Sequence, residues 1–138
     1  MQKMDFEEAV EAVLEKDRRY EMEAYAFLRD ALDFALKSEE EGVREENRHV
    51  DGGHLLNGFR DYALQEFGPM AQTVLDEWGV RSTDDVGEMV FNLIDVGVFG
   101  KADTDNREDF KGVYDFDKAF QGPYMPKSAK AIDVGDSN

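Results

Sequence analysis

The chain has 138 residues, which is enough for one domain built around one hydrophobic core. It has no cysteine, so disulfides, thiolate nucleophiles and Cys-ligated metal centres are excluded. Its formal net charge is −16 at pH 7, which argues against binding to a nucleic-acid backbone because that requires clustered Lys and Arg.

The apolar pattern indicates a folded protein outside the membrane. Hydrophobic residues make up 41% of the chain, too many for a wholly disordered protein. No apolar run is long enough for a transmembrane helix. The acidic, amphipathic start lacks the basic-then-apolar order of a signal peptide. We therefore expect a cytoplasmic protein with no membrane segment.

Two helices are predicted near the start of the chain. Residues 5–16 carry apolar side chains at helical spacing, and Asp5 is placed to cap the helix. The second helix spans about 22–37, and its apolar residues cover more than one stripe, so it should be central to the core. The core-facing residues are Phe6, Ala9, Val10, Val13 and Leu14 in the first helix, and Ala24, Phe27, Leu28, Ala31, Leu32 and Ala35 in the second.

Two more helices are predicted after a polar connection. The segment SEEEGVREENRHVDGG, residues 38–53, has few apolar residues and predicts an exposed loop. Asp51 can cap a third helix over about 52–67. Pro69 suits the first position of a fourth helix, because its missing N–H would be unpaired there anyway. The apolar face of that fourth helix comprises Met70, Ala71, Val74, Leu75 and Trp78.

The junction after the fourth helix is predicted to be structurally important. Trp78 should anchor the core, because Val74 and Leu75 lie one turn back on the same side of the helix. Gly79 can end the helix in the left-handed conformation, with Val80 packing back on the last turn. Truncating a buried Trp would cost about 3–5 kcal/mol.

A fifth helix is predicted between a cap and a glycine. Ser82 followed by Asp85 reads as an acidic capping box, with Thr83 as the alternative cap, and Gly97 ends the helix. Beyond it, Val98–Phe99 and Val113–Phe116 could pair as two short strands, with a one-turn helix capped by Asn106 between them.

The predicted fold is therefore mainly α. It is a single domain of about five helices, the last three of which, with the short β-hairpin, are arranged like a winged helix. The domain covers residues 1–120, and the tail, 121–138, is expected to be disordered.

A winged helix that reads DNA needs Arg, Lys, Asn or Gln on its exposed recognition helix. The fifth helix contains neither Lys nor Arg, and Asn92 is its only exposed side chain of the required kind. We therefore expect no DNA binding and interpret this face as one that meets a protein. The partner-binding candidates are Asp84, Asp85, Glu88, Asn92 and Asp95.

Two histidines invite a metal hypothesis. Glu46 and His49 stand three residues apart, as in one half of a helical carboxylate di-metal site. Such a site needs a second Glu-x-x-His pair, but His54 has no glutamate three residues before it. We therefore predict no metal, no cofactor and no catalytic residue, and keep Glu46, His49 and His54 only as secondary metal candidates.

Several segments together resemble a small bacterial family of unknown function found mainly among planctomycetes and verrucomicrobia. They are RDYAL, FGPMA, VLDEWG, STDDVGEMVFNLI and EDFKGVYDF, and the resemblance covers roughly residues 6–120. In that family Ser-Gly-x-Glu follows Arg-His-Val, whereas this chain has Asp51-Gly52-Gly53-His54. The resemblance implies no activity and therefore no catalytic residue.

The leading functional hypothesis is a non-enzymatic cytosolic module that binds another protein, which would be basic if the acidic surface makes the contact. One alternative is a small acidic hydrolase or metal-binding enzyme, which should have a perturbed carboxylate or histidine in a pocket. The other is an acidic regulator that mimics nucleic acid and competes for a basic partner.

Overall fold

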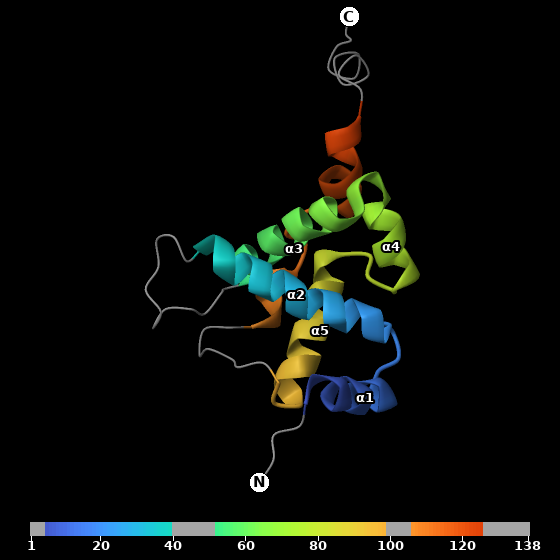
Figure 1. Ribbon diagram of the computed structural model, residues 1–138, viewed down its shortest axis with the longest axis vertical. Coiled ribbons are helices and arrows are strands. Elements are labelled where there is room, and N and C mark those ends of the chain that lie inside the picture. The colour runs from blue at the N-terminus through green and yellow to red at the C-terminus, as the bar shows by residue number, and fades with distance from the viewer. Residues whose placement is uncertain (1–4, 40–51, 99–105, 126–138) are drawn as a thin grey trace, which may run out of the picture.

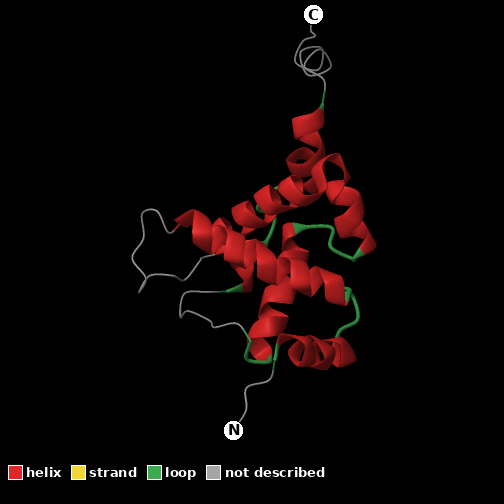
Figure 2. Cartoon of the chain, viewed as in Figure 1, coloured by secondary structure: helices red, strands yellow, loops and turns green. Residues whose placement is uncertain are grey.

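The computed structural model describes residues 5–39, 52–98 and 106–125, and its regular structure there is entirely helical (Figure 1). No strand occurs in these ranges (Figure 2). No helix within them is long and apolar enough to span a bilayer. The helices are α1 (Phe6–Lys16), α2 (Met22–Glu39), α3 (Gly52–Phe67), α4 (Ala71–Glu77) and α5 (Thr83–Asp95), with single turns η2 (Gly68–Met70), η3 (Arg107–Phe110), η4 (Asp117–Gln121) and η5 (Gly122–Tyr124).

α1 begins where the sequence predicts, directly after Asp5. The Asp5 carboxylate accepts a hydrogen bond from the backbone N–H of Glu8 at 2.9 Å, and the Glu8 carboxylate accepts one from the backbone N–H of Asp5 at 3.4 Å. This capping box satisfies two donors that lack a partner inside the helix. Ala9, Val10 and Val13 are buried, so α1 packs its apolar face on α2 and α5.

α2 is the centre of the fold, as its wide apolar face predicts. Tyr25, Leu28 and Ala31 have no exposed surface. α2 crosses in front of α5 and packs along α3 (Figure 1). A Cβ added to Gly58 of α3 would lie 2.7 Å from the Cβ of Ala35, so the close approach of the two helices depends on that glycine.

The entry to α4 differs from the prediction. Residues 68–70 form a short 3₁₀ turn, and α4 begins at Ala71 rather than at Pro69. Gly68 has a φ of +54°, a conformation that glycine adopts without strain, and this redirects the chain before the helix starts. Met70 was predicted to be buried, but it belongs to the turn and is 55% exposed.

The exit from α4 is the tight turn that the sequence predicts. Gly79 has a φ of +93°. Its N–H donates to the carbonyl of Asp76 at 3.0 Å, and the N–H of Val80 donates to the carbonyl of Leu75 at 2.9 Å. These two bonds form a Schellman closure, and Val80 is buried against the core.

Trp78 lies at the edge of the core rather than at its centre. Its ring is partly buried and packs against the buried residues. The ring centroid is 5.7 Å from that of Phe27 in α2 and 5.8 Å from that of Phe67 in α3. Trp78 therefore joins three helices through aromatic contacts while keeping part of its surface in water.

α5 begins at the predicted cap Ser82, but only half of the predicted capping box is present, because the Asp85 carboxylate accepts from the backbone N–H of Arg81 and not from that of Ser82. The Ser82 hydroxyl accepts a hydrogen bond from the backbone N–H of Asp85 at 3.2 Å. Gly97 has a φ of +85°, and a Cβ added there would meet no atom of the described residues within 4 Å, its chain neighbours aside. The inner face of α5 is fully buried and includes Val86, Met89 and Leu93.

The strand predicted at residues 113–116 is wrong, and Phe99 of the other strand lies outside the described residues. This part of the chain turns across the start of α5. The N–H of Gly112 donates to the Asp84 carboxylate at 3.0 Å, and the N–H of Val113 donates to the Thr83 hydroxyl at 3.1 Å. The backbone N–H groups of Gly112 and Val113 therefore bond to side chains of α5 and are not available to pair with a second strand.

The first residues of the predicted tail are helical. Gln121 ends η4, and its side-chain amide donates to that of Gln72 in α4 at 2.5 Å. Phe120 is fully buried and meets Phe116 edge to face at 4.9 Å between ring centroids. Residues 126–138 lie outside the described residues.

Candidate functional site

The polar face of α5, which the sequence predicts to meet a partner, makes many contacts inside the chain. Asp84 accepts the Gly112 N–H, as described above, while Asp95 at the far end of the helix is exposed. Asp85, Glu88 and Asn92 all face the connection between α1 and α2, residues 17–21.

Asn92 joins this connection to α2. Its side-chain amide donates to the Asp17 carboxylate at 3.0 Å and to the Tyr25 hydroxyl at 3.1 Å. Both amide hydrogens therefore have partners inside the protein. The one side chain of α5 suited to base edges has a structural role in this fold.

Asp85 holds the same connection from the other end. The Tyr20 hydroxyl donates to the Asp85 carboxylate at 2.6 Å, and the backbone N–H of Arg81 donates to its second oxygen at 2.8 Å. Tyr20 is only 2% exposed. Burial, together with this hydrogen bond to a carboxylate, raises the pKa of the Tyr20 hydroxyl well above its usual value.

Two arginines meet at Glu88. Its carboxylate accepts from Arg19 at 3.3 Å and from Arg107 of η3 at 2.9 Å. Arg19 also forms a two-point ion pair with Asp17, with N–O distances of 2.9 Å and 2.7 Å. The hydrogen bonds from Arg19 hold the pKa of the Asp17 carboxyl well below its usual range.

These contacts fix the connection between α1 and α2 on the surface of α5. The bonds from Arg19 to Glu88, from Tyr20 to Asp85 and from Asn92 to Asp17 each join residues more than sixty positions apart in the sequence. The backbone adds a further link, because the N–H of Glu21 donates to the carbonyl of Trp78 at 3.1 Å. The start of α2 is thereby held in place relative to the end of α1.

The raised pKa of Tyr20 predicts a loss of stability in alkali. A raised pKa in the folded state means that folding favours the protonated hydroxyl, so the stabilisation is complete below about pH 10 and is lost above it. For one such tyrosine, the free energy of unfolding should fall by up to about 1.4 kcal/mol per pH unit.

In Tyr20→Phe, the free energy of unfolding should fall less steeply as the pH rises above about 10. The substitution should also cost about 1–2 kcal/mol at neutral pH, because the hydrogen bond to Asp85 is lost. Urea unfolding at several pH values around and above about pH 10 measures both effects. Tyr124→Phe is the control, because Tyr124 is exposed. Parallel curves for Tyr20→Phe and the unchanged protein would contradict the prediction.

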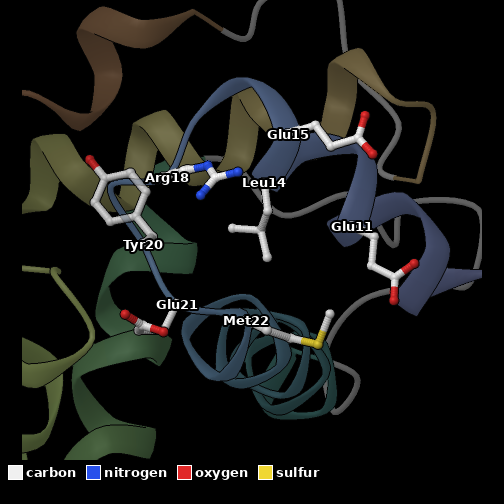
Figure 3. Close-up of a pocket in the computed structure, with 7 residues that line it drawn as sticks. All are labelled: Glu11, Leu14, Glu15, Arg18, Tyr20, Glu21 and Met22. Carbon is white, nitrogen blue, oxygen red and sulfur yellow. The ribbon is translucent and has the colours of Figure 1, made fainter.

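An open cleft lies between α1 and the start of α2 (Figure 3). Its volume is about 600 Å³. Leu14 points from α1 into the space, and Met22 lies across from it at the start of α2. Both side chains are partly buried and pack on the core. The other residues that line the cleft are Glu11, Glu15, Arg18, Tyr20 and Glu21.

Charged side chains around this cleft have no partner within the described part of the protein. The side chains of Glu11, Glu15 and Arg18 form no hydrogen bond or ion pair there. All three residues are exposed. The cleft therefore combines a small apolar floor with three glutamates, on α1 and at the start of α2, and one arginine.

The polar groups of the lining are mostly carboxylates. The lining also offers a guanidinium and a buried tyrosine whose hydroxyl is already bonded to Asp85. No group of three or more His, Cys, Asp or Glu side chains in the described ranges could hold a metal ion. His54 is half-buried in the first turn of α3, and Glu46 and His49 lie outside the described residues.

Sequence reasoning missed this cleft. It assigned Leu14 to the core-facing side of the first helix and gave no role to Glu11, Glu15 or Arg18. One signal was present: Glu11 and Glu15 are one helical turn apart, so they lie on the same side of α1. The space beside them depends on the angle between α1 and α2, which the local pattern does not encode.

Comparison with known proteins identifies no relative. No protein-family profile matches the chain, and neither curated proteins nor solved structures give a significant match. The resemblance to a planctomycete and verrucomicrobial family stays a prediction from the sequence.

Proposed function

We propose that this chain is a non-enzymatic, cytosolic protein-interaction module, and that it binds its partner in the cleft between α1 and α2. The observation that carries the proposal is the lining of the cleft, in which the apolar side chains of Leu14 and Met22 are bordered by charged groups that have no partner among the described residues. Small apolar floors with polar rims are typical of protein contacts.

The polar face of α5 supports the cleft rather than competing with it. Asp85, Glu88 and Asn92 bind the connection between α1 and α2, and this keeps the cleft open in the free protein. A preformed site costs less ordering when a partner binds. Asp95 and the outer surface of Asp84 remain candidates for a secondary contact.

No observation among the described residues favours the two alternative functions. The acidic hydrolase or metal-binding enzyme would use acidic residues together with His49, and both His49 and its neighbour Glu46 lie outside those residues. The mimic of nucleic acid depends on the overall charge of −16 alone. The winged-helix likeness of the last three helices also stays a hypothesis, and the proposed function does not depend on it.

Affinity capture from the cells that make the protein tests the proposal. The bait carries Glu11→Lys and Glu15→Lys, and the matched control carries Asp33→Lys and Glu66→Lys. All four residues are exposed, and the control pair lies on α2 and α3, outside the cleft. Both baits therefore undergo the same change of net charge.

We expect a partner that is recovered with the unchanged protein and with the control, and is lost with the cleft variant. Circular dichroism and thermal unfolding confirm that each bait is folded. A set of captured proteins that is identical for the cleft variant and the control would show that this cleft is not the binding site.

A further inference from the structure

The arrangement of charge around the cleft restricts the partner further. Glu11 and Glu15 lie on one side of α1 at a separation of four residues, about 6 Å along the helix axis. Glu21 adds a third carboxylate at the start of α2, and Leu14 and Met22 provide the apolar floor. Arg18 is the only cation of the lining.

A helix is the simplest structure that matches this spacing. Lys or Arg residues at positions i and i+4 of a helix are also about 6 Å apart and lie on the same face. An apolar residue beside them, at i+1 or i+3, could reach the floor formed by Leu14 and Met22. Such helix-in-groove contacts are a recurring mode of peptide recognition.

Charge complementarity indicates that the segment bound in the cleft is positively charged. Glu11, Glu15 and Arg18 pair with no side chain in the ranges that the structure describes, so a ligand need not break an ion pair seen there to reach them. The net charge of the chain is −16, and its field attracts cationic segments from a distance. A second copy of this chain carries the same charge and would be repelled.

We infer that the cleft between α1 and α2 binds an amphipathic helix of a partner protein that carries two Lys or Arg residues one turn apart beside an apolar residue. This inference rests on the proposed function, because it names the class of partner for the same site. Glu11 and Glu15 pair with the two cations, Leu14 and Met22 contact the apolar residue, and Arg18 weakens the attraction.

The test uses a fluorescein-labelled model helix with Lys at i and i+4 and Leu at i+3, repeated over three turns. A second peptide has the same composition in an order that separates Lys and Leu onto different faces. Fluorescence anisotropy measures the Kd of each peptide for the full chain. We expect binding on the order of 10–100 μM for the first peptide and at least about fivefold weaker binding for the second.

Three variants then locate the contact. Glu11→Lys with Glu15→Lys should weaken binding by about tenfold or more, because two attractive contacts become repulsive. Asp33→Lys with Glu66→Lys should weaken it by less than about threefold, through the long-range field alone. Arg18→Glu should strengthen binding, since it replaces the cation of the lining with a carboxylate.

Equal binding of the two peptides, equal effects of the two double variants, or no binding by the first peptide would overturn the inference. The proposed function can survive that failure. If the model helix does not bind but capture from cells still depends on Glu11 and Glu15, then the cleft binds a partner of another kind. If capture does not depend on them, the proposed function itself is wrong.

Discussion

Gly79→Ala is expected to lower the free energy of unfolding by about 3–5 kcal/mol. Two effects add at this position. The φ of +93° is one that alanine adopts only with strain, at a cost of about 1–3 kcal/mol. A Cβ at Gly79 would also overlap the carbonyl oxygen of Arg19, which belongs to the connection between α1 and α2. Because that oxygen is backbone, no rotamer change can relieve the overlap.

Gly97→Ala is the matched control for this substitution. Gly97 has a similar φ of +85°, but an added Cβ there would meet no atom of the described residues within 4 Å, its chain neighbours aside. The control should therefore cost only the conformational part, about 1–2 kcal/mol. Urea unfolding of both variants measures the difference. Equal losses of stability at the two glycines would mean that the overlap of the added Cβ with the Arg19 carbonyl oxygen does not destabilise the fold.

Trp78→Ala is expected to cost about 2–4 kcal/mol, which is the lower part of the range for buried aromatic residues or slightly less. The ring is only partly buried, so less apolar surface is transferred from water than in the centre of a core. Its contacts with Phe27 and Phe67 account for most of the expected loss. Thermal unfolding should show a Tm lower by about 10 °C.

Two further substitutions serve as comparisons for Trp78→Ala. Trp78→Phe keeps an aromatic ring near Phe27 and should lose less than half as much as Trp78→Ala. Met70→Ala removes an exposed side chain and should change the Tm little. An unchanged Tm in Trp78→Ala would contradict the prediction, because it would mean that the packing of the ring against Phe27 and Phe67 does not stabilise the fold.

Features that depend on residues close together in the sequence could be predicted. The boundaries of α1, α3 and α5 follow from apolar spacing and from capping by Asp5 and Ser82. The left-handed conformations of Gly79 and Gly97 follow from their positions just after helix ends. In each case the interactions that decide the structure lie within a few residues of one another.

Features that depend on distant residues could not be predicted. Thr83 and Asp84 accept hydrogen bonds from residues 112 and 113, and this replaces the strand that the sequence suggested. Asn92 looks like an exposed polar residue in the helical pattern, yet it binds Asp17 across the fold. The cleft is a further case, since it depends on how α1 and α2 are held by these same contacts.

The entry to α4 illustrates a conflict between two local signals. Pro69 is favoured in the first turn of a helix, but Gly68 before it permits a turn that other residues disfavour. The turn prevails, and the helix begins only at Ala71. The exposure of Met70 follows directly from that delay.

Site-specific photo-cross-linking in the cells that make the protein tests the central claim most directly. A benzophenone amino acid replaces Met22 in the cleft in one variant, and replaces exposed Lys118 of η4 in the other. If the cleft between α1 and α2 is the binding site, position 22 should give a covalent adduct with a helical, Lys- or Arg-rich segment of one partner, and position 118 should not. The account is contradicted if position 118 captures the same partner equally well, or if position 22 captures none.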